Sequence, residues 1–362
     1  MKRRALFLTS QFFAFGGAEM TIIELAEHLT ALGWSCEIRA AVVGAPLGMI
    51  AFEHRIEVSP IQPLMDVSSF DLVWCQHGTL ANIDFSALTQ SRKTLIVSAH
   101  LSPYTNLERV LHPLENELCD IIAVNSNETR SSLPQWINSE KVVVTNNPAP
   151  ASFFTNRSYN STVRNVLCVS NHIPHELSHV LLHFMRDLMI NVTTIGAKYT
   201  YARTTPRHIA DCDLVISIGK TVQYALASRT PTYVYDHFGG DGWITSRNID
   251  TMSDYNFSGR PSCRKLTSAA ILKELLGDYQ YAINEINDIP HNKINRYHID
   301  TLISLITHNV TPLHPIQVHA VDARILETTN LQIQLIHQMY KYKYPDEHNS
   351  IWCSPSIDQY YR

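Results

Sequence analysis

Two adjacent glycines follow the first short apolar run of the chain. Gly16 and Gly17 come after the run Ala5–Leu8 and directly precede a helical pattern of apolar residues. Glycine lets backbone N–H groups approach an anion closely, and the N-terminal end of a helix adds a positive field. The spacing differs from G-x-G-x-x-G, so it does not indicate a nicotinamide dinucleotide site. On the residues alone, an anion-binding turn and a tight structural turn both stay open.

A lysine follows a later apolar run in the same way. Gly219, Lys220 and Thr221 stand between the run Asp213–Ser217 and a helical pattern. This segment offers a helix N-terminus, a hydroxyl group and a point charge to a diphosphate. It is not a P-loop, because the first glycine of that motif is missing. The alternative is an ordinary helix whose lysine faces solvent.

The segment Asp236–Trp243 combines three glycines with acidic and aromatic residues. It follows an apolar run, and its composition predicts a polar loop at the end of a strand. Asp236, His237 and Asp241 could hydrogen-bond to sugar hydroxyls, and Trp243 could stack on a sugar ring or pack beneath the loop. A purely structural turn is the alternative.

Two histidines also stand at the ends of expected buried strands. His77 follows the run Leu72–Cys75, and His100 follows Thr94–Ser98. An imidazole can donate to a hydroxyl group or stabilise developing charge near neutral pH. We expect His100 at the reaction centre, with His77 as a weaker candidate. A histidine that is satisfied by backbone groups at a strand end is the alternative.

The sequence contains one literal H-E-x-x-H motif, at His175, Glu176 and His179 on a predicted helix. Two histidines at i and i+4 with an intervening glutamate are typical of zinc metalloproteases. The extended form of that motif fails here, and no glutamate follows before Glu274 to supply a nearby third ligand. We therefore predict no metal site, and a zinc hydrolase stays a remote alternative.

Short apolar strands alternate with helical patterns through most of the chain, which favours an α/β fold with parallel sheets covered by helices. Strands are predicted at residues 5–8, 35–43, 72–75, 94–98, 121–125, 141–145, 165–170, 192–196, 213–217 and 230–236. Helices are predicted at 22–32, 104–118, 126–133, 174–188, 206–210, 220–228, 269–276, 299–306 and 325–340. The Asn-, Pro- and Ser-rich segment 145–162 is expected to link two Rossmann-like domains.

The composition excludes several classes of protein. With 362 residues, 45% of them hydrophobic, the chain can bury about two domain cores. Its net charge of -4 gives no basic field for nucleic acid. The seven scattered cysteines suggest a reducing compartment. No 18-residue apolar window and no adequate signal-peptide core occur, so we expect a cytoplasmic protein without a transmembrane segment, compatible with peripheral contact at the inner face of the membrane.

Several of these segments occur in an order that resembles a known family. The resemblance covers residues 5 to about 250. Its segments are Gly16–Glu19, the His77 segment, Val97–His100, Ala123–Ser126, Val144–Pro148, Val169–His172, Ile218–Thr221 and Tyr235–Trp243. In this order they resemble the family 4-like (group 1) glycosyltransferases of the GT-B fold, in particular bacterial enzymes of surface polysaccharide biosynthesis.

The resemblance implies a fold and an activity. It implies two Rossmann-like domains facing a cleft: residues 1–150 for the acceptor, residues 151–290 for the nucleotide-sugar donor, and a helical tail at 291–362 that partly braces the N-terminal domain. The implied reaction moves a sugar from a nucleotide-sugar to a saccharide or lipid-linked saccharide acceptor, with retention of configuration and without a metal or other cofactor.

The resemblance also implies site residues. His100 would be the catalytic residue that orients the transferred sugar, and Glu19 and His77 would contact the acceptor. The residues expected to bind the donor are Gly16, Gly17, Asn171, His172, Gly219, Lys220, Thr221, Tyr224, Asp236, His237, Gly239, Gly240 and Asp241.

The chain departs from the family at the donor site. Tyr224 and Ile216 stand where the family carries the two glutamates of its E-x7-E pair, and Ser170, Asn171 and His172 stand where it carries Arg and Lys. The charge of a diphosphate would then rest on Lys220, Arg203 and backbone amides. Two alternatives therefore stay open beside the transferase: a catalytically degenerate GT-B binding protein and a sugar-nucleotide epimerase.

Overall fold

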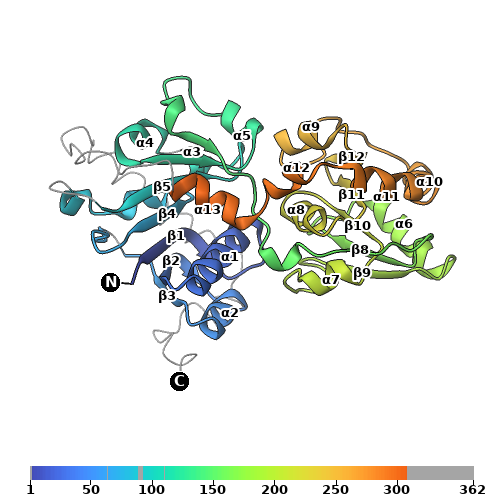
Figure 1. Ribbon diagram of the computed structural model, residues 1–362, viewed down its shortest axis with the longest axis horizontal. Helices are drawn as coiled ribbons and strands as arrows, with labels where there is room; N and C mark the ends of the chain where they lie inside the picture. Colours follow the sequence, from blue (N-terminus) through green and yellow to red (C-terminus); the bar gives the residue numbers. More distant parts are fainter. Residues whose placement is uncertain (1, 63, 89–92, 110, 308–362) are drawn as a thin grey trace. The chain divides into compact units, whose positions relative to one another are not determined.

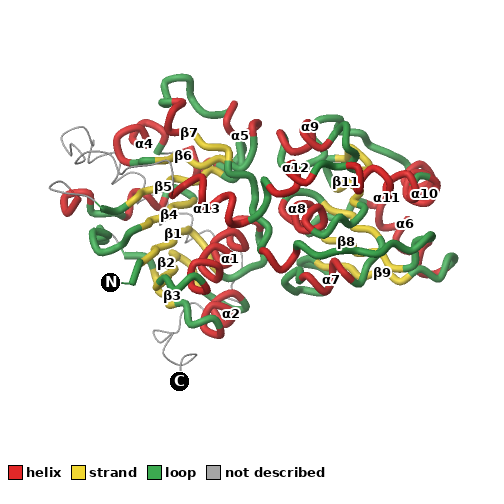
Figure 2. Tube along the Cα trace, viewed as in Figure 1, coloured by secondary structure: helices red, strands yellow, loops and turns green. Residues whose placement is uncertain are grey.

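The computed structural model describes residues 2–62, 64–88, 93–109 and 111–307, which divide into two compact units. The first unit holds most of the described residues up to Val144, together with Ser304–Thr307. The second holds Thr145–Ile303 and the short stretch Ser126–Glu128. In Figure 2 the strands of each unit run side by side among helices.

The first unit is built on a seven-stranded sheet whose paired strands are all parallel, in the order β3-β2-β1-β4-β5-β6-β7. The strands are β1 (Arg4–Phe12), β2 (Ser35–Val43), β3 (Glu57–Pro60), β4 (Leu72–Gln76), β5 (Leu95–His100), β6 (Ile121–Val124) and β7 (Val142–Val144). Every residue of β4, β5 and β6 is buried, as expected for strands covered on both faces. The strand order reverses between β1 and β4, and ligands of doubly wound folds bind at such a reversal.

Helices connect these strands (Figure 1). They are α1 (Gly17–Ala31), α2 (Leu47–Glu53), α3 (Asn106–Arg109), α4 (His112–Leu118) and α5 (Asn127–Ser131). The first of them, α1, packs on β1 and β2 and buries its apolar residues there. It begins directly after Gly16, so its N-terminus lies at the carboxyl end of β1.

The second unit has a five-stranded sheet in the order β12-β11-β10-β8-β9. Its strands are β8 (Asn165–Val169), β9 (Asn191–Ile195), β10 (Leu214–Ser217), β11 (Thr232–Asp236) and β12 (Gly239–Trp243). All pairs are parallel except β11 with β12. Counted along the chain, this is the 2-1-3-4-5 order of a doubly wound sheet, with its reversal between β8 and β10.

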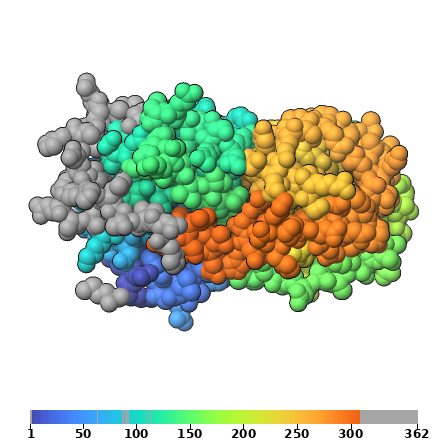
Figure 3. All heavy atoms as spheres, turned by 45° about the horizontal axis from the view of Figure 1, so that its top comes forward, coloured from blue at the N-terminus to red at the C-terminus, as the bar shows by residue number. Residues whose placement is uncertain are grey.

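The helices of the second unit include a C-terminal series that forms part of its surface (Figure 3). They are α6 (His175–Arg186), α7 (Pro206–Ala210), α8 (Lys220–Ala227), α9 (Ile249–Asp254), α10 (Ser268–Gly277), α11 (Tyr279–Asp288), α12 (His291–Asn295) and α13 (Ile299–Thr307), of which α13 spans the division between the units. None of the described helices combines the length and apolar character needed to cross a bilayer.

The predicted fold class is confirmed: the chain contains two α/β units, each with a Rossmann-like parallel sheet. Each strand predicted from an apolar run is present; the ends of most shift by one or two residues, and β1 extends four residues further than predicted, to Phe12. The sequence analysis missed β3 at the sheet edge. The helix predicted at 325–340, and most of the tail 291–362, lie outside the described residues.

The prediction that Asp236–Trp243 forms a loop is wrong for most of its length. Gly239–Trp243 forms β12, antiparallel to β11. The glycines are needed there for close packing, because a Cβ atom on Gly240 would lie 2.1 Å from the carbonyl oxygen of Val234. Trp243 packs in the core and donates its Nε1–H to the Glu274 carbonyl at 3.0 Å. Its indole therefore serves packing, and this settles the choice that the sequence left open.

The segment that was predicted as a linker is held by buried contacts within the second unit. Ala149 is buried, and its backbone exchanges hydrogen bonds with Tyr297 and Ile299. The guanidinium of Arg157 donates to the carbonyl oxygen of Ile209 at 2.9 Å and also to that of Cys212. These contacts attach Ala149 and Arg157 to α7, to the loop that follows it and to the start of α13.

Substitution can distinguish a glycine that is needed for close packing from one that lies in open space. We expect Gly240→Ala to lower the free energy of unfolding by about 2–3 kcal/mol, because the new methyl group overlaps backbone atoms of β11. Gly17→Ala is the matched control, since a Cβ there meets nothing within 4 Å, and we expect a change within about 0.5 kcal/mol. Urea unfolding of both variants measures the difference. Equal losses would contradict a packing role for Gly240.

Candidate functional site

His77 lies at the strand reversal of the first unit and bridges its two central strands. It follows β4 with a φ of 55°, a left-handed conformation that is uncommon for a residue with a side chain. Its Nδ1 lies 2.9 Å from the hydroxyl of Ser10 and 3.2 Å from that of Thr9, both on β1. Burial lowers the pKa of His77 to about 4, so the ring is neutral at neutral pH. Strained backbone of this kind is often found at functional sites.

The turn at Gly16 and Gly17 closes over a carboxyl group of its own helix. Glu19, in the first turn of α1, is buried and contacts the side-chain amide of Gln11. A Cβ on Gly16 would lie 2.2 Å from Glu19 Oε2, so the glycine makes room for this carboxyl. Burial raises the pKa of Glu19 to about 7. The group can therefore hold or release a proton near neutral pH, and it occupies the space in which an anion would meet the turn.

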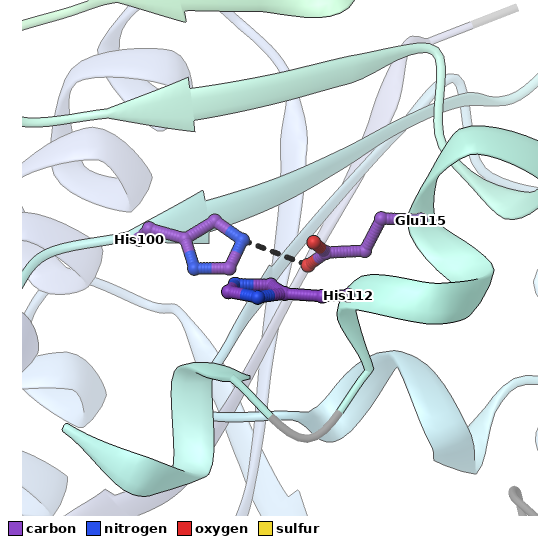
Figure 4. Close-up of side chains that lie close together, drawn as sticks. All are labelled: His100, His112 and Glu115. Atoms are coloured by element: carbon purple, nitrogen blue, oxygen red, sulfur yellow. Dashed lines mark hydrogen bonds and ion pairs between the residues drawn. The ribbon is translucent and has the colours of Figure 1, made fainter. Parts of the chain in front are cut away.

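A cluster of two histidines and a glutamate lies at the end of β5 (Figure 4). His100 is the last residue of β5, and its Nε2 lies 2.8 Å from Glu115 Oε1 on α4. The same carboxylate accepts a hydrogen bond from the Ser98 hydroxyl at 2.6 Å. The ring of His112, the first residue of α4, lies with its centroid 5.1 Å from that of His100. The relative exposures of His100, His112 and Glu115 are 3%, 6% and 1%, so the whole group is buried.

In this cluster, burial and the charge of Glu115 shift the pKa of the histidines in opposite directions. Burial alone would lower the pKa of His100, but the charge of Glu115 and its hydrogen bond outweigh burial and raise it. For His112 burial prevails, and its pKa is lowered. His100 and Glu115 therefore form a buried ion pair, with a neutral His112 beside it.

Glu108 connects this cluster to His77. Its Oε2 accepts hydrogen bonds from the backbone N–H groups of Leu101 and Ser102, each at 2.9 Å. Its Oε1 lies 3.8 Å from His77 Nε2. Burial raises the pKa of Glu108 to about 7. The end of β1 contributes two hydroxyls to this connected set of groups, and the ends of β4 and β5 contribute His77 and His100.

The sequence analysis did not single out Glu108, His112 or Glu115. One signal was available, because His112 and Glu115 stand three residues apart within a predicted helix and so share a face. That they face His100 depends on how α4 packs against β5, which spacing alone does not give.

In the second unit, several predicted donor-site residues meet at the ends of β8 and β11. The Ser170 hydroxyl donates to Asp236 Oδ2 at 3.0 Å and accepts from the backbone N–H of His172 at 2.9 Å. Asp236 Oδ1 accepts from the backbone N–H of His237 at 2.7 Å. The rings of His172 and His237 are exposed, and their centroids lie 5.3 Å apart. Ser170, which the sequence analysis did not list as a site residue, fixes this arrangement.

The side chains of Asn171 and Asp241 accept hydrogen bonds from neighbouring loops. Asn171 accepts a hydrogen bond from the backbone N–H of Ala197 at 2.9 Å. Asp241 Oδ1 accepts from the backbone N–H and the hydroxyl of Ser262, at 2.9 and 2.6 Å. Gly239 lies against the Arg264 carbonyl, 2.5 Å from where its Cβ would be.

Lys220 is buried, with a relative exposure of 7%. Its ammonium group donates to the Pro148 carbonyl at 2.9 Å and lies 5.3 Å from the ring centroid of Tyr224. The alternative of a lysine facing solvent is therefore wrong. Tyr224 itself is buried and stacks on Phe153, with ring centroids 4.3 Å apart.

The two residues on either side of Lys220 are differently placed. Gly219 precedes α8 with a φ of 61° and a ψ of -136°, a conformation essentially restricted to glycine. Thr221 is half-buried in the first turn of α8. The N-terminus of α8 thus lies at the carboxyl end of β10, as the sequence predicted.

The H-E-x-x-H segment forms the first turns of α6 but assembles no metal site. His175 and His179 are exposed, and Glu176 accepts a hydrogen bond from the Tyr235 hydroxyl at 2.8 Å. Within the described ranges, the one group of metal-ligating residues whose donor atoms converge is His100, His112 and Glu115.

No protein-family model matches the sequence, and no curated protein matches it either. Among solved structures, a glycosyltransferase from Rickettsia africae ESF-5 is similar, with a TM-score of 0.48 and 12% identity, covering 85% of this chain and 100% of its own. MurG from Acinetobacter baumannii has a TM-score of 0.46 and 12% identity, covering 84% and 99%. MnaA of S. aureus, a co-structure with UDP, has a TM-score of 0.46 and 14% identity, covering 85% and 96%. Because these identities and TM-scores are low, the fold of this chain is assigned from its own strand order.

The burial of His77 predicts a pH-dependent stability. Its pKa is lowered from 6.5 to about 4, so the unfolded chain binds a proton that the folded chain does not, and stability falls as the pH drops through this window. We expect His77→Asn, which tolerates the left-handed backbone, to be less stable than the wild type at pH 7 and to recover about 2 kcal/mol of that difference by pH 4.5.

Urea unfolding at both pH values measures this difference. His175→Asn, at an exposed position, is the control and should follow the wild type at each pH. A stability difference for His77→Asn that does not change with pH would contradict a half-buried His77 that stays neutral in the folded chain.

The placement of Lys220 predicts a structural role for its ammonium group. We expect Lys220→Met to lower the free energy of unfolding by about 1–3 kcal/mol, because the buried Pro148 carbonyl loses its donor. Lys273→Met, on the exposed face of α10, should change it by less than about 0.5 kcal/mol. Thermal and urea unfolding provide the measurement. An unchanged stability of the Lys220→Met variant would contradict this structural role.

Proposed function

We propose that this protein is a GT-B glycosyltransferase, similar to the bacterial family 4-like enzymes. It would move a sugar from a nucleotide-sugar to a saccharide or lipid-linked saccharide acceptor, with retention of configuration and without a metal ion in the transfer step. One observation carries the proposal. A single chain holds two Rossmann-like sheets, and at the strand reversal of each, polar groups gather at the carboxyl ends of the strands.

This placement supports two polar ligands rather than one. Doubly wound sheets bind ligands at the carboxyl ends of their strands, at the point where the order reverses. In the first unit that point carries His77, and in the second it carries Ser170 and His172. A transferase must hold a donor and an acceptor, and two such sites in one chain meet this requirement.

We assign the donor to the second unit. The exposed imidazoles of His172 and His237 are available there to hydrogen-bond phosphate or sugar oxygens, and the N-terminus of α6 adds a positive field. Lys220 is engaged with the Pro148 carbonyl, so in this proposal it supports the start of α8, and the diphosphate rests on imidazoles and backbone amides.

We assign the acceptor to the first unit. His77 is neutral at neutral pH and can exchange a hydrogen bond with an acceptor hydroxyl, while the Glu19 carboxyl, with a pKa of about 7, can take up or release a proton. His100 lies deeper, with Nε2 on Glu115, and we assign it a positioning role at the end of β5. The reaction would take place in the cytoplasm, at the inner face of the membrane where the acceptor is lipid-linked.

A second candidate is a catalytically degenerate binding protein of the same fold. One observation favours it: Tyr224, which stands where the resembling enzymes carry a glutamate, is buried and stacked on Phe153. A buried aromatic ring therefore stands where a carboxylate could accept hydrogen bonds from ribose hydroxyls. A sugar-nucleotide epimerase is the third possibility and differs from the transferase in its products.

A thermal-shift screen against nucleotides and nucleotide-sugars tests the proposal. A ligand that binds the native state at about 100 times its Kd should raise the free energy of unfolding by about 2.7 kcal/mol. We expect at least one nucleotide-sugar to do so, and the double variant His172→Ala/His237→Ala to bind it about tenfold or more weakly. His183→Ala, in the last turn of α6, is the matched control and should bind as the wild type does. If no nucleotide or nucleotide-sugar stabilises the protein, the proposal is wrong.

Turnover then separates the three candidates. A transferase releases free nucleotide only when an acceptor is present. An epimerase converts the sugar without an acceptor, and a degenerate binding protein binds without turnover.

A further inference from the structure

The group formed by His100, His112 and Glu115 has features that the proposed transfer reaction does not use. Two imidazoles and a carboxylate come from the end of β5 and from the first turns of α4, and one ligand atom from each lies within 4.8 Å of the others. Figure 4 shows the rings of His100 and His112 next to the carboxylate of Glu115. All three side chains are more than nine-tenths buried.

Two polar atoms of this group have no hydrogen-bond partner within the described part of the chain. They are Nε2 of His112 and Oε2 of Glu115, and both are shielded from solvent. Buried polar atoms are almost always paired, so two orphans in one group of three side chains call for an explanation. An ion bound between the three side chains would engage them.

We propose that His100, His112 and Glu115 bind one divalent transition-metal ion, with Zn²⁺ as the reference cation. Two imidazole nitrogens and one carboxylate oxygen are a common ligand set for Zn²⁺ and for similar ions, whereas Mg²⁺ and Ca²⁺ prefer oxygen ligands alone. In the ion-free form a hydrogen bond of 2.8 Å joins His100 Nε2 and Glu115 Oε1. The cation would lie between the same two groups in place of that hydrogen bond.

The surroundings fit a bound ion. The Ser98 hydroxyl donates to Glu115 Oε1 and would orient this carboxylate from outside the ligand set. The ion would cross-link the end of β5 to α4, on either side of the segment that carries Glu108. Binding would therefore fix the position of Glu108, and through it the surroundings of His77. The test of this ion site does not depend on turnover, so it can fail or succeed separately from the proposed transferase activity.

The test uses the full chain with any affinity tag removed, stripped with a chelator and titrated with Zn²⁺ and Co²⁺. We expect one ion per chain in metal analysis and calorimetry, and an apparent Tm about 5 °C higher or more at 100 times Kd. His112→Ala is the informative variant, because His112 Nε2 has no described partner to lose. It should weaken binding about tenfold or more and should abolish the metal-dependent Tm shift.

His179→Ala is the matched control, because it removes a histidine of the exposed H-E-x-x-H motif. It should bind the ion as tightly as the wild type. The proposal is overturned if no stoichiometric binding occurs, if His112→Ala binds as the wild type does, or if His179→Ala alone loses the ion. Should His112→Ala fail to fold, NMR of wild-type protein loaded with Co²⁺ decides: paramagnetically shifted signals from the His100 and His112 rings support the site, and unshifted signals exclude it.

Discussion

Two parallel neighbouring strands must be joined by a crossover connection, usually through a helix. Where two successive connections lie on opposite faces of the sheet, their helices leave the carboxyl ends of the strands between them uncovered. Both sheets of this chain contain one such reversal, between β1 and β4 and between β8 and β10. The polar side chains at these points depend on that constraint. His77 reaches the hydroxyls of Ser10 and Thr9 because β1 and β4 are adjacent at the reversal.

Burial determines the charge state of the groups that gather there. Desolvation disfavours the charged form of a group, so it raises the pKa of a carboxyl and lowers that of an imidazole. Glu19 and Glu108 are both raised to about 7, and His77 is lowered to about 4. His100 is the exception, because the charge and hydrogen bond of Glu115 outweigh the cost of its burial. At the carboxyl ends of the first sheet's strands, two carboxyl groups are therefore partly protonated at neutral pH and lie near one buried ion pair.

The sequence predicted the strands well, because runs buried on both faces are continuous and apolar. It also placed His77, His100, His172 and Gly219 at strand ends, since that follows from element boundaries alone. It misjudged β12, because glycine-rich composition suggests a loop, whereas here the glycines allow close approach to β11 and to Arg264. It missed Glu108, His112 and Glu115, because their meeting with His100 depends on the packing of α4 on β5. The burial of Lys220 could not be predicted from the sequence either, because its hydrogen-bond partner Pro148 precedes it by 72 residues.

Tyr224 and Ile216 stand where the resembling family 4-like enzymes carry paired glutamates, and this difference is best understood together with the burial of Lys220. Without those carboxylates, the start of α8 has no side-chain anion to hold a ribose, and the Tyr224 ring that replaces one of them packs on Phe153. The ammonium of Lys220 then lies against that same ring and the Pro148 carbonyl, which fixes residues 148–153 against α8. Both changes turn the start of α8 toward the core. Under the proposed function, recognition of a donor in this unit would therefore fall to the ends of β8 and β11, where Ser170 holds Asp236 in place and the imidazoles of His172 and His237 are exposed.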